Sequence, residues 1–205
     1  MKLFKNIKKW LENQAHLFYL FLLILIVPNI ILCFTEPMPI VAKVCNVLLP
    51  FAFYYLLMTL SRNCGKMFWI LFLFIFFGAF QIVLLYLFGQ SIIAVDMFLN
   101  LVTTNSSEAL ELLDNLIPAI VIVVLLYIPA LAMATVSVIK KRELPELFIH
   151  RERKRARLAM IAGVLSLGAA YLFDSRYELK SDLYPANVCY NIALAFQRTA
   201  QTQSY

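Results

Sequence analysis

The stretch HLFYLFLLILIVPNIILCF, residues 16–34, decides the fold of this chain. It contains no lysine, arginine, aspartate or glutamate over its whole length. A helix rises about 1.5 Å per residue, so a segment of this length nearly crosses the roughly 30 Å hydrocarbon core of a bilayer. The stretch therefore predicts a transmembrane helix.

The composition of the other residues extends this prediction to the whole chain. Apolar residues make up 62% of the 205 positions and charged residues 15%, whereas soluble proteins have about a quarter charged residues. Four more windows are apolar enough to cross a membrane: 41–60, 67–88, 116–139 and 158–173. The sequence thus predicts an all-α membrane protein, a five-helix transmembrane bundle over 16–173.

The last of these windows is the shortest, and its flanks and composition suit a packed helix. Arg157 and Tyr171 stand where they can snorkel to the two water boundaries. Ala162, Ser166 and Ala170 follow one another at intervals of four, which places three small side chains on one helix face. This stripe predicts close packing against a neighbouring helix.

The basic residues predict the orientation of the bundle. Fourteen of the 18 lysines and arginines fall in 2–9, 62–66 and 140–157, which lie on the same side when the five windows alternate in direction. Because basic loops stay in the cytoplasm, we expect the N-terminus inside and the C-terminus outside. The same rule explains KKRELPELFIHRERKRAR, residues 140–157, as a topology signal rather than a nucleic-acid site.

The first fifteen residues predict an amphipathic helix on the cytoplasmic face. Apolar side chains fall on one helical face and lysines on the other, which suits a helix lying in an anionic membrane surface. A simple basic anchor is the plainer interpretation. The apolar face consists of Leu3, Phe4, Ile7, Trp10 and Leu11.

Residues that typically carry chemistry are sparse. The four cysteines form no CxxC pair, and the two histidines have no carboxylate at a metal-ligand spacing. We therefore expect no catalytic residue and no metal site in these 205 residues. Lys43 is the one charged residue that we find within the windows, which disfavours a proton-coupled transporter.

A polar segment between the third and fourth windows interrupts this pattern. We expect it to form an outer helix over 96–115, on which Asn100, Thr104 and Glu108 share one face because they are four residues apart. An amide, a hydroxyl and a carboxylate in line could hold a polar lipid headgroup. The alternative is a capping box, with Asn105 at the N-cap and Glu108 three residues later.

At these residues the chain resembles the N-terminal membrane domain of the bacterial phosphoethanolamine transferases that modify lipid A. The resemblance is carried by DMFLNLVTTNSSEALELL (96–113), by the five-window layout and by the tail SDLYPANVCYNIALAF (181–196). By this resemblance, Asn100, Thr104 and Glu108 would bind the donor, phosphatidylethanolamine. Residues 174–205 would form a periplasmic bridging segment, with Val188, Cys189, Ile192 and Phe196 on the apolar face of an interfacial helix.

The resemblance also implies what else the activity requires. Family members carry a periplasmic domain with a threonine nucleophile and zinc, and these 205 residues show neither motif. The chain alone is thus expected to be inactive, with zinc in a further domain. The partners implied are phosphatidylethanolamine and lipid A in the bacterial inner membrane, and no nucleic acid. Two other functions stay open, a small polytopic transporter and a non-catalytic membrane adaptor.

Overall fold

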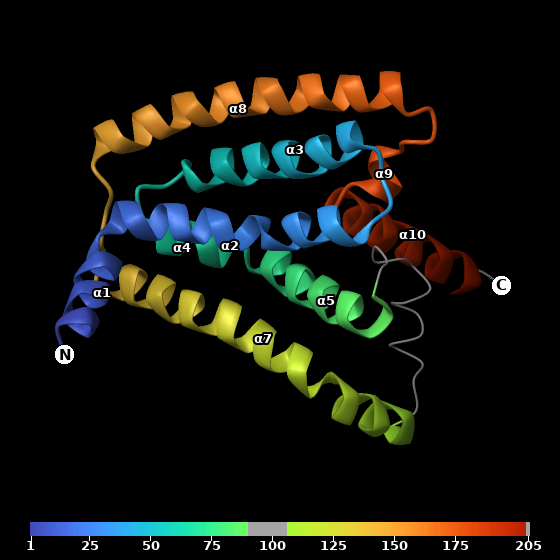
Figure 1. Ribbon diagram of the computed structural model, residues 1–205, viewed down its shortest axis with the longest axis horizontal. Helices are drawn as coiled ribbons and strands as arrows, with labels where there is room; N and C mark the ends of the chain where they lie inside the picture. The colour runs from blue at the N-terminus through green and yellow to red at the C-terminus, as the bar shows by residue number, and fades with distance from the viewer. Residues whose placement is uncertain (90–105, 204–205) are drawn as a thin grey trace.

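A computed structural model of the protein describes residues 1–89 and 106–203, and within these ranges it contains helices and no β-strand. A bent pair, α4 (Cys64–Ile70) and α5 (Phe72–Phe88), would cross a membrane if it forms a single span. This architecture confirms the predicted all-helical class with several apolar helices (Figure 1). Four described helices are each long and apolar enough to cross alone: α2 (Gln14–Thr35), α3 (Ile40–Met58), α7 (Ser106–Ile139) and α8 (Glu146–Phe173).

The amino-terminal residues form a separate amphipathic helix, α1 (Lys2–Glu12), as the sequence predicts for 1–15. Asn13 is extended and ends it, and its side-chain oxygen accepts a hydrogen bond from Ala15 N at 3.0 Å, which caps α2. Trp10 stacks on His16 with ring centroids 4.6 Å apart. No residue of α1 is buried, and its exposed apolar side chains are Leu3, Phe4, Ile7 and Trp10.

Helices α3 and α8 pack closely because small residues lie where they meet. Ala156, Gly163 and Ala170 are buried at intervals of seven along α8. A Cβ added to Gly163 would lie 3.0 Å from Leu49 Cα on α3, so a larger residue would push the two helices slightly apart. Ala170 of the predicted stripe is buried, whereas Ala162 is exposed and its neighbour Gly163 makes the contact instead.

The predicted window 67–88 is divided in the structure. Helices α4 and α5 meet at Leu71 with a bend of 63°. Helix α4 leans onto α7, where a Cβ on Gly65 would lie 2.4 Å from Ala134 O. Asn63 caps α4 by accepting from Lys66 N and also donates to Ser137 O at 3.1 Å, so it fixes α4 against α7.

Two helices differ in length from the predicted windows. Helix α8 begins at Glu146, so most of the basic segment is helical and extends the window 158–173. Helix α7 is continuous from Ser106, so the described part of the predicted outer helix belongs to the same helix as the window 116–139. Residues 96–105 of that prediction lie outside the described ranges.

The chain finishes with two helices at one end of the bundle. Helix α9 (Leu179–Asp182) and helix α10 (Ala186–Gln203) follow α8. We call this end, where α2 finishes and α3 begins, the carboxy-terminal end, and the opposite end, with α1 and the start of α8, the amino-terminal end (Figure 1). The Ser106 end of α7 also lies towards the carboxy-terminal end (Figure 1).

Candidate functional site

Two buried asparagines occupy the carboxy-terminal end of the bundle. Asn29 of α2 donates to Asn46 O at 3.0 Å and to Tyr184 O at 2.7 Å. Asn46 of α3 donates to Asp182 O at 2.8 Å. Both amides therefore satisfy backbone carbonyls of the segment between α8 and α10, where an unpaired carbonyl would cost about 1–3 kcal/mol. These contacts fasten the carboxy-terminal segment to the transmembrane helices.

Two tyrosines strengthen the same attachment. Tyr177 donates its hydroxyl to Asn46 Oδ1 at 2.7 Å, and burial raises the pKa of this hydroxyl above its ordinary value. Tyr184 is 1% exposed and donates to Phe74 O at 3.3 Å, just after the α4–α5 bend. The segment is thus tied to α2, α3 and α5 together.

Helix α10 continues this packing through its first turns. Val188 is buried and Ile192 packs beside it, against Leu32 of α2 and Leu84 of α5. Phe196 is 73% exposed, and Cys189 is also exposed. The predicted apolar face of this helix is therefore divided. Its first part is docked on the bundle, and Phe196 remains available to lipid.

An apolar cavity of about 300 Å³ lies beside the attached segment. Its volume is at the lower end of the range for small-molecule sites, and its nearly complete lack of polar surface suits a hydrocarbon chain rather than a headgroup. Because α9 and α10 form one wall, the asparagine contacts also set the shape of the cavity. It is lined by Leu49, Pro50, Phe53, Phe74, Met160, Leu179, Leu183, Pro185, Ala186 and Cys189.

A second, much smaller space adjoins Asn29. It measures about 10 Å³ and is lined by polar as well as apolar groups, including Asn46 and Tyr184. The Oδ1 atom of Asn29 is buried and has no hydrogen-bond partner within the described residues. This volume accommodates about one water molecule, which would satisfy that oxygen, and it is too small for a lipid headgroup.

The structure describes only one of the three predicted site residues, Glu108. Asn100 and Thr104 lie outside the described residues, as does Asn105 of the capping alternative. Glu108 lies in the first turn of the described part of α7, and the position of its side chain is outside what is described. The Asn100–Thr104–Glu108 site therefore stays a prediction from spacing and resemblance.

A buried carboxylate at the amino-terminal end was missed by the sequence reasoning. Glu152 of α8 is 0% exposed although it stands within the basic segment. Tyr55 of α3 donates its hydroxyl to Glu152 Oε2, and Arg151 Nε and Arg155 Nη1 each lie 3.0 Å from Oε1. Both oxygens of the carboxylate are therefore paired.

The position of Glu152 on α8 explains its burial. It lies three residues after Ile149 and four before Ala156, so it belongs to the same buried face as the small residues that contact α3. Arg153 donates to Thr59 O at 2.7 Å and joins α8 to the end of α3 a second time. A paired carboxylate on a packing face joins two helices, and this arrangement favours a structural role over an ion pathway.

Comparison with known proteins does not assign a function to this arrangement of residues. Neither a protein-family model, nor a curated protein, nor a solved structure matches the chain. Within residues 1–89 and 106–203, no three histidine, cysteine, aspartate or glutamate side chains are grouped so that they could hold a metal ion.

We predict that Asn46→Ala will loosen the carboxy-terminal segment while leaving the bundle folded. The substitution removes the partner of Asp182 O and leaves the Tyr177 hydroxyl with its contact to Cys45 Sγ, at a cost of about 1–3 kcal/mol. Local opening of 177–188 should therefore rise by about five- to 150-fold, measured by amide hydrogen exchange. Asn13→Ala is the control, because it removes a cap at the other end and should leave exchange in 177–188 unchanged.

Proposed function

We propose that this chain is the membrane domain of a phosphoethanolamine transferase, which moves phosphoethanolamine from phosphatidylethanolamine to lipid A. In this proposal the carboxy-terminal end faces the periplasm and the amino-terminal end faces the cytoplasm. The bundle anchors the enzyme and helps to hold the donor lipid, and the reacting groups lie on a zinc-bearing periplasmic domain. The family resemblance of 96–113 and 181–196 supports this assignment.

The observation that carries the proposal is the attachment of the carboxy-terminal segment. Asn29 and Asn46 hold this segment at the end of the bundle towards which the Ser106 end of α7, with Glu108, also points. A domain that follows α10 would therefore start from a fixed position on the same membrane face as the predicted headgroup site. A linker with no buried hydrogen bonds to the bundle would not provide this positioning.

The apolar cavity supports a lipid rather than a soluble substrate. One acyl chain of a lipid can enter between α3, α8 and α9. Both substrates of the proposed reaction are lipids confined to one membrane. A bundle that holds one of them next to a tethered catalytic domain raises the effective concentration of the reactants.

The positions of the basic residues support the proposed orientation. Four basic segments lie at the amino-terminal end: α1, the α3–α4 connection, the α7–α8 connection and the first half of α8 (Figure 1). An excess of lysine and arginine marks the cytoplasmic side of bacterial membrane proteins. Glu152 is the observation that most favours a transporter, because it is a buried carboxylate. Its oxygens are paired with Tyr55, Arg151 and Arg155, which favours a structural role instead.

We expect the full-length protein to add phosphoethanolamine to lipid A in a Gram-negative host that lacks its own such enzymes. Mass spectrometry of extracted lipid A detects the added group. Residues 1–205 expressed alone are the matched control and should transfer nothing, because they contain no predicted nucleophile or metal site. Transfer by residues 1–205 alone would contradict the proposed division of labour, and no transfer by the full-length protein would contradict the function.

A further inference from the structure

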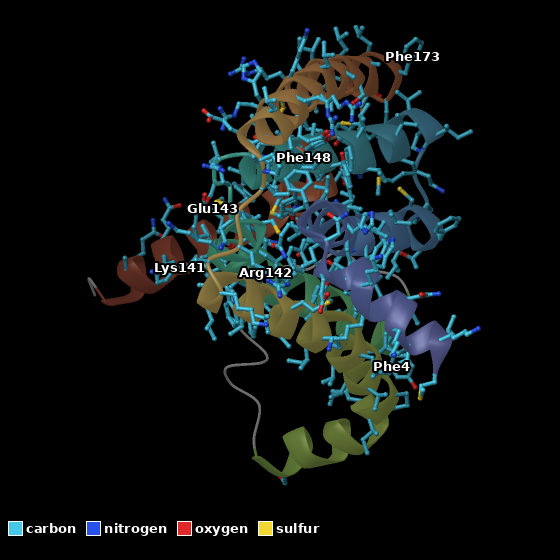
Figure 2. The ribbon with its side chains drawn as sticks, turned by 90° about the vertical axis from the view of Figure 1, so that its left-hand side faces the viewer. Phe4, Lys141, Arg142, Glu143, Phe148 and Phe173 are labelled. Carbon is cyan, nitrogen blue, oxygen red and sulfur yellow. The ribbon has the colours of Figure 1, made fainter. Side chains whose placement is uncertain are left out.

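A cavity of about 470 Å³ separates α1 from α7 at the amino-terminal end. Its floor is apolar and comes from both helices, with Ile7 and Leu11 on one side and Met133 and Val136 on the other. Figure 2 looks onto this end of the bundle, with Phe4 on α1 and Arg142 where α7 finishes. The cavity is distant from the apolar cavity at the carboxy-terminal end and from Glu108.

Three cations stand among the residues that line this cavity. They are Lys8 of α1, and Lys140 and Arg142 directly after α7, against the single carboxylate of Glu12. In the described part of the chain, no carboxylate lies within 4 Å of the charged group of Lys8, Lys140 or Arg142. The cavity therefore combines an apolar floor with an excess of positive charge among its lining residues.

The position of α1 makes this cavity accessible from the membrane. Leu3, Phe4, Ile7 and Trp10 are exposed on α1, a pattern that places a helix in the interfacial plane of a bilayer. Phe4 and Ile7 belong both to this exposed face and to the cavity lining. The apolar side chains that α1 would place in the membrane surface thus continue into the lining of the cavity.

We propose that the cavity between α1 and α7 binds one anionic glycerophospholipid from the adjacent leaflet. One acyl chain occupies the apolar floor, and the phosphate is held by Lys8, Lys140 and Arg142. The charge of these three residues distinguishes an anionic lipid from a zwitterionic one. The bound lipid joins α1 to α7 and holds the amphipathic helix against the bundle. This inference is independent of the proposed transferase activity.

The test is native mass spectrometry of the purified chain titrated with phosphatidylglycerol or with phosphatidylcholine of the same acyl chains. We expect phosphatidylglycerol to bind at least about tenfold more tightly, because it keeps a net negative charge among the basic residues of the lining, whereas the choline ammonium of phosphatidylcholine cancels the charge of its phosphate. Replacing Lys8, Lys140 and Arg142 together with glutamine should bring the ratio of the two affinities close to one. Equal affinity of the unmodified chain for both lipids would overturn the proposal.

Two controls separate a built site from general attraction to a basic protein. Replacing Lys2, Lys5 and Lys9 with glutamine removes the same charge from residues that do not line the cavity, and should preserve the preference for phosphatidylglycerol. Ala132→Phe fills the cavity and should weaken the binding of both lipids, whereas Val124→Phe, elsewhere on α7, should not. An equal loss of the phosphatidylglycerol preference in the two triple variants, or no effect of Ala132→Phe, would contradict a site between α1 and α7.

Discussion

Replacing Glu152 with alanine should lower the free energy of unfolding by about 2–4 kcal/mol. The substitution leaves the buried Tyr55 side chain without an acceptor for its hydroxyl, which costs about 1–3 kcal/mol, and it opens a space between α3 and α8. Unfolding in mixed micelles measures the change. Glu146→Ala is the control, because Glu146 is an exposed acid in the first turn of the same helix, and its loss should cost about 1 kcal/mol or less.

The neighbouring arginines distinguish a charge effect from a packing effect. Replacing Arg151 and Arg155 together with glutamine leaves a buried carboxylate without a cation and should destabilise the bundle. Adding Glu152→Gln to this double variant removes the buried charge and keeps an acceptor for Tyr55, so part of the stability should return. A triple variant that is less stable than the double variant would contradict the idea that the arginines act by stabilising the charge of Glu152.

Glu152 also marks a limit of reading charge from sequence. Six of the eight residues from His150 to Arg157 are charged, and such a run predicts a solvated segment. The buried position becomes visible only through its spacing to Ile149, Ala156 and Gly163, which lie on one face of a helix. The positive-inside pattern applies to the whole basic segment 140–157. The pairing with Tyr55 of α3 involves only Glu152 within that segment.

The apolar windows were predictable because length and composition alone determine them. The division of 67–88 was not, because residues 67–75, MFWILFLFI, contain neither proline nor glycine. The bend instead accompanies contacts between distant parts of the chain. Gly65 allows α4 to approach α7, and Tyr184 contacts α5 just after Leu71. Contacts of this kind are set by the tertiary fold and leave no local signal.

The attachment of the carboxy-terminal segment was missed for a related reason. Asn29 and Asn46 are single polar residues within long apolar runs, and neither forms a motif. A buried amide in a membrane helix requires partners, so each was a signal that another polar group lies nearby. The partners are carbonyl groups of Asp182 and Tyr184, more than 130 residues away, and backbone groups cannot be recognised from sequence.

In the full-length protein, Glu108→Gln should reduce transfer of phosphoethanolamine to lipid A by about ten- to a hundredfold. In the proposal, the Glu108 carboxylate binds the ammonium group of the donor lipid. A hydrogen bond to a charged group contributes about 1.5–3 kcal/mol. Glutamine retains the shape of glutamate and one acceptor oxygen, but it has an amide donor in place of the second oxygen and carries no charge. The measurement is the rate of phosphoethanolamine addition, together with the thermal stability of each purified variant.

This substitution also separates the headgroup role of Glu108 from a capping role. A capping box accepts glutamine as well as glutamate at its third position, so Glu108→Gln should leave the start of α7 and the stability nearly unchanged. Asp114→Asn removes an acid further along α7, outside the spacing of four, and should leave the rate within about twofold of the unmodified protein. A Glu108→Gln variant with a normal rate, or one whose rate falls only in proportion to its folded fraction, would contradict a role for this carboxylate in holding the donor.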